Sequence, residues 1–294
     1  MTQLPADQNL RDKVSNPELG QVEHSQKAAA GSIGSGLSRT SAIARNAFRE
    51  AVRDRVLYNL VIFALLLIAG AIFLGELSAG QEAKIIVDLG LSAILLFGVF
   101  IAIFVGVGLV YKEIERRTLY AILAKPVGRG EFLLGKYLGL SLTLLVNVLI
   151  MGVGLSLALI FVKRGFDPLV IRIWPAILLI YVELTILTGV ALFFSSFSSP
   201  ALSALLTFFV FVIGHFSADL KTLAHSMGSA PARWLFAGLY YLLPNLANYN
   251  IITPAAHGVS PDPASVLMAI VYGLVYVGVL LAATTLVFRR RNLK

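Results

Sequence analysis

From residue 38 onward, long uncharged apolar stretches alternate with shorter polar ones, a pattern typical of proteins that cross a membrane several times. A helix needs about 20 apolar residues to cross the roughly 30 Å of hydrocarbon in a bilayer. The uncharged run over 184–218 is too long for one span, and the turn-forming sequence S-S-F-S-S-P at 195–200 divides it. The pattern therefore predicts an all-α integral membrane protein with six transmembrane helices. The predicted spans are residues 56–75, 89–111, 137–162, 173–194, 201–216 and 264–288.

The segments outside the spans are polar or amphipathic. Residues 1–37 are rich in Ser, Gly, Ala and Gln and contain no apolar run, so we expect a disordered cytoplasmic tail and no signal peptide. Residues 38–55 follow a helical repeat that separates Phe48 and small apolar side chains from an arginine face. Such a helix should lie along the membrane surface, although a soluble helix leading into the first span is the alternative. Residues 289–294 form a basic cytoplasmic tail.

Composition and charge support the membrane class and suggest an orientation. Only 14% of the residues are charged, against about 25% in soluble domains, and the absence of cysteine excludes disulfides and thiolate metal sites. Lys and Arg number eighteen in the N-terminal segment, the 112–136 loop and the C-terminal tail, but six in the other loops. By the positive-inside rule, both termini should be cytoplasmic, in a multi-pass protein of the inner (cell) membrane. The net charge of +8 then reports orientation rather than nucleic-acid binding.

The loops assigned to the outer side have two unusual features. Lys163, Arg164 and Arg172 lie in a short outer loop, against the charge bias. The last outer segment, 219–263, is long for a connector. Its aromatic residues suit a helix at the outer membrane interface, which could shape an exit path or only seal the bundle. These aromatic residues are Trp234, Phe236, Tyr240 and Tyr241.

Two short stretches resemble nucleotide-binding motifs but occur in the wrong context. Residues 130–136 read G-x-x-x-x-G-K, yet Tyr137 stands where a magnesium-ligating Ser or Thr is needed. Residues 131–142 are predicted to be helical, and helical N–H groups cannot cradle phosphate. Residues 77–81, L-S-A-G-Q, resemble an ATPase signature but precede the first stretch and fall in an outer loop. We therefore expect no ATP hydrolysis and no bound cofactor in this chain.

The loop over 112–136 is the most informative polar segment. It carries an apolar stripe near helical spacing beside dense charge, and Pro126 and Gly128 should end its helix before Glu131 begins the next. A short amphipathic helix at the inner surface can dock into a partner's groove, or it can only pad the headgroup region. Spacing alone leaves both readings open. The stripe is Ile114, Leu119, Ile122 and Leu123, and the charges are Glu113, Glu115, Arg116 and Arg117.

This loop resembles the first cytoplasmic loop of type-2 ABC exporter permeases, whose pattern is roughly E-x-E-x-x-T-L-x-x-L-L-x-x-P-V-x-R-x-E-x-x-x-G-K. The matches are Glu113, Glu115, Thr118, Leu119, Ile122, Leu123, Pro126, Val127, Arg129, Glu131, Gly135 and Lys136. Arg117 stands where many members have Gly, which is similar to the branch linked to maturation of nitrous-oxide reductase and multicopper enzymes. The stretch L-L-P-N-L-A-N-Y-N at 242–250 also resembles that branch.

The resemblance implies a permease subunit without catalytic residues. Two permeases, most simply a homodimer within membrane lipid, would pair with two copies of a separate ABC ATPase subunit that binds ATP and magnesium. The 112–136 loop would be the coupling helix that receives the ATPase. Its implied contact residues are Glu113, Glu115, Arg116, Arg117, Thr118, Leu119, Ile122, Leu123, Pro126, Arg129 and Glu131.

Three polar residues within the predicted spans are further candidates: Glu183, Asn147 and His215. An intramembrane carboxylate is costly and often functional, so Glu183 could contact substrate or relay protons. It could equally be a protonated structural group bonded to a Ser, a Thr or Asn147. His215, near the outer end of the fifth span, is expected to cap a hydrogen-bond network. The four histidines have no close ligand spacing, so we expect no metal site.

Two other functions compete with the permease reading. A proton-coupled secondary transporter using Glu183 would transport without an ATPase, but the sequence shows no inverted repeat. A membrane scaffold would recruit a cytosolic partner through 112–136 and form no translocation path. The sequence does not indicate the transported substrate.

Overall fold

The computed structural model describes residues 36–78, 80–115, 128–217, 222 and 230–290. Every regular element in these residues is helical, which confirms the all-α class. The first 35 residues of the predicted tail and residues 291–294 of the basic tail lie outside the described part. The five long elements are α3 (Arg55–Glu76), α4 (Glu82–Glu115), α6 (Arg129–Lys163), α8 (Trp174–Ser195) and α13 (Pro263–Arg290). The shorter elements are a helix over residues 36–52, α7 (Leu169–Arg172), α9 (Pro200–His215), α11 (Ala230–Leu242), η1 (Leu246–Tyr249) and α12 (Ile252–Ala256).

Within the described residues, five helices are long and apolar enough to cross a membrane. They are α3, α4, α6, α8 and α13, and they cover five of the six predicted spans. The remaining predicted span corresponds to α9, which has 16 residues. At 1.5 Å per residue, α9 is about 24 Å long, less than the roughly 30 Å of hydrocarbon. The sixth crossing therefore stays a prediction.

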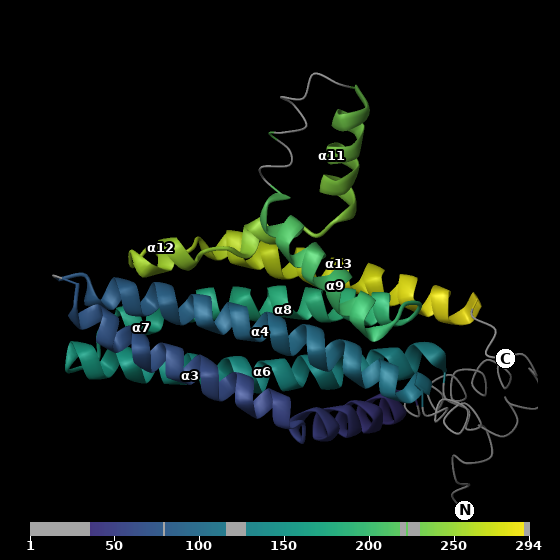
Figure 1. Cartoon of the computed structure of the whole chain (residues 1–294), viewed down its shortest axis with the longest axis horizontal. Coiled ribbons are helices and arrows are strands. Elements are labelled where there is room, and N and C mark those ends of the chain that lie inside the picture. The colour runs from purple at the N-terminus through teal and green to yellow at the C-terminus, as the bar shows by residue number, and fades with distance from the viewer. Residues whose placement is uncertain (1–35, 79, 116–127, 218–221, 223–229, 291–294) are drawn as a thin grey trace, which may run out of the picture.

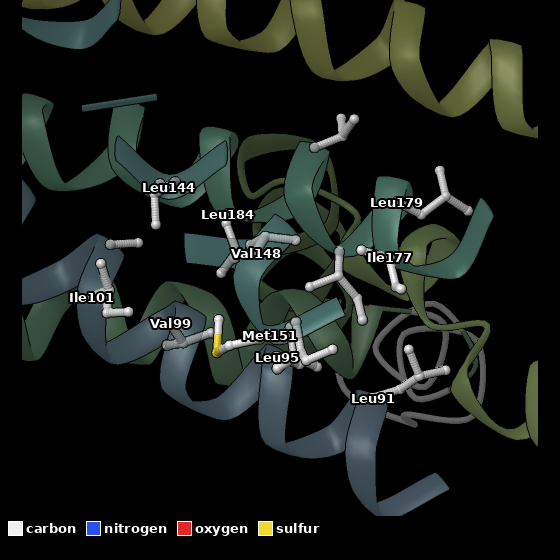
Figure 2. Close-up of a cluster of buried hydrophobic side chains, with 14 of the residues drawn as sticks. Leu91, Leu95, Val99, Ile101, Leu144, Val148, Met151, Ile177, Leu179 and Leu184 are labelled. Atoms are coloured by element: carbon white, nitrogen blue, oxygen red, sulfur yellow. The ribbon is translucent and has the colours of Figure 1, made fainter. Parts of the chain in front are cut away.

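The bundle is built around α4 and α8. α8 packs against α4, α6, α9 and α13, whereas α3 packs against α4 and α6 on the other side (Figure 1). Side chains from α4, α6 and α8 interlock in the centre, where Leu95, Met151 and Leu184 are fully or almost fully buried (Figure 2). The outer faces of α3 and α13 remain apolar and exposed, as expected for surfaces that meet lipid or a second membrane protein.

The chain after α9 leaves the bundle and then returns to it. α11 projects away from the long helices in Figure 1, with Trp234 and Tyr241 almost fully exposed. This confirms a helix in the predicted aromatic segment, while its place at a membrane interface stays a prediction. η1 then packs against α8 and α9, and α12 packs against α4.

Candidate functional site

The first candidate region is the start of α6, where the 112–136 loop ends. Glu131 lies in the first turn, and its Oε2 accepts a hydrogen bond from the Gly128 backbone N–H at 3.3 Å. This bond satisfies one of the N–H groups that a helix start leaves open. The same carboxylate oxygen lies 3.8 Å from Nε of Arg39, on the helix over 36–52. Glu131 therefore joins the loop's end to the N-terminal helix.

Lys136 makes a second link between α6 and the N-terminal helix. Its side chain is 1% exposed, and its Nζ lies 3.6 Å from Oε2 of Glu50. A buried ammonium is costly unless it is paired, so Glu50 stabilises its position. Lys136, the lysine of the P-loop-like stretch, thus pairs with an acidic residue of the N-terminal helix.

Two glycines of α6 let the N-terminal helix lie directly on its surface. A Cβ at Gly135 would come within 2.8 Å of Ile43, and one at Gly139 within 2.5 Å of the Ala44 carbonyl oxygen. A side chain at either glycine would force the helices apart. Small residues spaced four apart on one helix commonly allow such close packing. Residues 36–52 therefore form part of the bundle beside the loop; their predicted place at the membrane surface remains a prediction.

Most of the loop itself lies outside the described residues. Glu113 and Glu115 lie in the last turns of α4, and Arg129 begins α6. Residues 130–136 are within α6, which confirms that this stretch is helical. The undescribed predicted contacts are Arg116, Arg117, Thr118, Leu119, Ile122, Leu123 and Pro126.

The second candidate region is a pair of titratable groups inside the bundle. Glu183 on α8 is fully buried, and its Oε1 lies 3.4 Å from Nδ1 of His215 on α9. Within the described part of the chain, neither Glu183 carboxylate oxygen nor Nδ1 of His215 has a hydrogen-bond partner, so their contact is one of proximity and charge. The His215 ring also packs on Phe211, with 4.8 Å between ring centroids. The two groups form an ion pair only when the imidazole is protonated and the carboxyl is ionised.

Asn147, the third polar candidate, does not join this pair. Its Nδ2 donates to the Thr143 backbone oxygen at 2.7 Å, one turn earlier in α6. It is buried, and this local bond gives one of its amide N–H groups a partner within its own helix. The Glu183 carboxylate lies beside His215 instead, and the predicted part of His215 in an outer-surface hydrogen-bond network stays a prediction.

A segment that sequence reasoning noted without assigning roles lies beside Glu183. The Tyr249 hydroxyl donates to the Ala269 carbonyl oxygen at 2.7 Å, which ties η1 to α13. Ser217 donates to Oδ1 of Asn245 at 2.6 Å, which ties the same segment to the end of α9. Leu246 is fully buried against Gly214. The only sequence signal was the resemblance of residues 242–250, because single Asn and Tyr residues give no periodic pattern.

The described residues contain no cluster of three or more His, Cys, Asp or Glu side chains suited to a metal ion. The Glu183–His215 pair offers two such groups only. In the described structure the pair is a buried contact between α8 and α9.

Comparison with known proteins agrees with these features. The family described as "ABC-2 family transporter protein" matches residues 41–293. The "Probable ABC transporter permease protein NosY" of Pseudomonas aeruginosa is 27% identical over 271 residues, covering 85% of this chain and 97% of that protein. A protein of the same name from Stutzerimonas stutzeri is 29% identical over 274 residues, with the same coverage of both chains. The chain therefore belongs to the ABC-2 transporter family and is a multi-pass transmembrane permease subunit of an ABC transporter.

Proposed function

We propose that this permease works in an ATP-driven exporter and that a separate ATPase subunit acts on it through the 112–136 loop. The observation that carries the proposal is the form of the two helices flanking this loop. α4 has 34 residues and α6 has 35, the longest helices in the described structure. At 1.5 Å per residue each is over about 50 Å long, well beyond the hydrocarbon thickness. A force on the loop would therefore be passed directly to two long, continuous helices, α4 and α6.

The packing of these two helices explains how a push would reach the rest of the permease. α4 contacts α3, α6, α8 and α9, so a tilt of α4 moves most of the bundle. The Arg39–Glu131 and Lys136–Glu50 pairs hold the N-terminal helix on the loop end of α6. The loop and this helix would then move as one body when the ATPase subunits close around ATP and magnesium.

The assembly that fits this mechanism contains two permeases, most simply two copies of this chain, and two ATPase subunits. Both termini and the loop face the cytoplasm of the inner membrane in this arrangement. The eighteen Lys and Arg residues in those segments support the orientation. The exposed apolar faces of α3 and α13 offer surfaces for the second permease or for lipid.

The test is to purify the full chain with its co-expressed ATPase in mild detergent and to compare two charge reversals. Glu113→Lys/Glu115→Lys changes the loop end of α4. Glu76→Lys/Glu82→Lys makes the same charge change at the opposite end of the bundle, at the end of α3 and the start of α4. We expect only the loop variant to lose the ATPase and the ATP hydrolysis of the complex. Equal ATPase retention in the two variants would contradict the proposal.

The Glu183–His215 pair favours a second candidate, proton-coupled transport by the chain alone. This candidate predicts proton uptake into liposomes that contain the chain without an ATPase, and its loss in Glu183→Gln. The ATP-driven proposal predicts no such uptake in either protein. A scaffold differs from both, because it would bind the ATPase without ATP-dependent transport.

A further inference from the structure

A cavity of about 530 Å³ lies at the end of the bundle opposite the 112–136 loop. Four segments that are far apart in the sequence line it: the turn between α3 and α4, the end of α6, α7, and the end of α12. α7 and α12 mark this end in Figure 1, away from the two termini. Its volume lies within the roughly 300–1,000 Å³ of known small-molecule sites.

Three basic side chains from three different helices line this cavity. Lys84 comes from the first turn of α4, Lys163 from the last turn of α6, and Arg172 from the end of α7. Lys163 and Arg172 are two of the basic residues that run against the charge bias of the loops. Together with Lys84, these two residues concentrate positive charge at one cavity. This shared location gives a physical reason for their departure from the charge bias.

The acidic residues of the lining do not cancel this charge. Asp167 is held in place, because its Oδ1 accepts the Leu169 N–H at 2.8 Å at the start of α7. Its Oδ2 lies 3.8 Å from Nζ of Lys163 and so orients that lysine. Glu82 is the only other carboxylate in the lining, so the three cations exceed the acids by one charge.

Arg172 and His257 are held at the side of the cavity formed by α12. Nη1 of Arg172 donates to the Gly258 carbonyl oxygen at 3.5 Å, which leaves other guanidinium N–H groups for a ligand. Nδ1 of His257 lies 2.8 Å from the Thr253 carbonyl oxygen. Since a carbonyl only accepts, Nδ1 carries the proton, and the tautomer of His257 is thereby fixed.

Two glycines in the left-handed backbone region also line the cavity. Gly80 has φ +86° and Gly258 has φ +74°, a conformation that favours glycine over other residues. A Cβ at Gly80 would meet no atom within 4 Å, so this turn borders open space. Because both turns use glycine, no side chain enters the cavity at either position.

We propose that this cavity binds a phosphate group through Lys84, Lys163 and Arg172. Guanidinium and ammonium groups together suit phosphate, because they supply charge-assisted hydrogen bonds from several directions. The phosphate belongs either to the headgroup of an anionic lipid, since the cavity lies at the ends of membrane helices, or to a solute from the aqueous side. The inference is independent of the proposed ATPase coupling, because it concerns the opposite end of the bundle.

The test measures binding to the purified, delipidated full chain by native mass spectrometry. The probes are phosphatidylglycerol, diacylglycerol as the comparison lipid without a phosphate group, and inorganic phosphate. Lys84→Gln/Arg172→Gln removes two cations, and Arg164→Gln removes a neighbouring exposed cation that does not line the cavity. Lys84→Arg/Arg172→Lys keeps both charges and separates charge loss from misfolding.

We expect the double Gln variant to bind phosphatidylglycerol at least tenfold more weakly than wild type, since it loses two charge-assisted hydrogen-bonding groups. The Arg164→Gln and charge-keeping variants should stay close to wild type. Weaker phosphatidylglycerol binding with no phosphate binding identifies a lipid site, and weaker binding of both probes identifies a phosphate site open to solutes. Equal binding by wild type and the double Gln variant would overturn the proposal. So would a loss of the same size in Arg164→Gln, or no preference of the wild type for either phosphate-containing probe over diacylglycerol.

Discussion

The Glu183 carboxylate on α8 lies 3.4 Å from the His215 imidazole on α9, and the carboxylate is fully buried. The pair joins the most buried long helix to the one predicted span that is too short for a full crossing. α9 cannot be held by length alone, so this polar contact and the η1 segment fix its position beside α8. Protonation of either group would therefore change the charge at the contact between α8 and α9.

Removing one member of this pair should destabilise the bundle. His215→Ala leaves the Glu183 carboxyl buried without its neighbour, which costs about 1–3 kcal/mol. Glu183→Gln keeps the shape and a neutral hydrogen-bonding group, so its cost should be smaller. Thermal unfolding of both single variants and the double variant in detergent gives a coupling energy of about 0.5–3 kcal/mol for groups in contact. Strictly additive effects of the two substitutions would show that the groups do not interact.

The packing of the N-terminal helix on α6 predicts opposite effects for two glycine substitutions. Gly139→Ala places a methyl group 2.5 Å from the Ala44 carbonyl oxygen and should destabilise by about 1–3 kcal/mol through overpacking. Gly278→Ala, in α13, meets nothing within 4 Å. It should be stabilising by about 0.5–1 kcal/mol through helix propensity. Unfolding midpoints of the two variants measure the difference.

Limited proteolysis provides a second measurement of the same contact. Displacement of the helix over 36–52 in Gly139→Ala should speed cleavage within it, whereas Gly278→Ala should be cut at the wild-type rate. If both variants unfold and are cleaved alike, the N-terminal helix does not pack on α6 in the membrane protein.

The Lys136–Glu50 pair predicts that the two partners respond differently to neutralisation. Glu50→Gln removes a carboxylate 3.6 Å from an ammonium that is 1% exposed. Because the Glu50 side chain is itself 39% exposed, the loss should destabilise by less than the about 3–5 kcal/mol of a fully buried pair. Lys136→Met removes the buried charge itself and fills a similar volume, so its cost should be smaller. Denaturation of the two variants at the same pH compares them. Equal costs, or a larger cost for Lys136→Met, would mean that Glu50 is not the main counter-charge.

The sequence predicted the long helices well because charge is so rarely tolerated within a bilayer. The ends of uncharged runs lie close to the ends of α3, α8 and α13. α4 and α6 instead extend well beyond the predicted spans, because helices continue through polar residues outside the hydrocarbon. The fate of 201–216 could not be predicted, since an apolar run of 16 residues fits both a short span and a partly buried helix.

In the candidate sites, the sequence predicted features that depend on neighbouring residues but not contacts between distant helices. Glu183 was identifiable because a carboxylate interrupts an apolar run, but its neighbour depends on how α8 packs against α9. Asn147 was a predicted partner, yet its amide nitrogen donates to the Thr143 carbonyl oxygen within its own helix. The role of Glu131 at a helix start was local and therefore readable, whereas its contact with Arg39 was not.

The segment that follows α11 gives the last prediction, which concerns Tyr249. Its hydroxyl donates to the Ala269 carbonyl oxygen at 2.7 Å, and the side chain is 1% exposed. Tyr249→Phe keeps the ring but removes this link between η1 and α13, so it should destabilise by about 0.5–1.5 kcal/mol. Tyr241→Phe is the matched control, because that side chain on α11 is 84% exposed. Unfolding midpoints in detergent should fall for Tyr249→Phe and stay unchanged for Tyr241→Phe. An equal response of the two variants would mean that the η1 segment is not anchored to α13 by this hydroxyl. The Ser217–Asn245 bond and the buried Leu246 would then hold the segment in place.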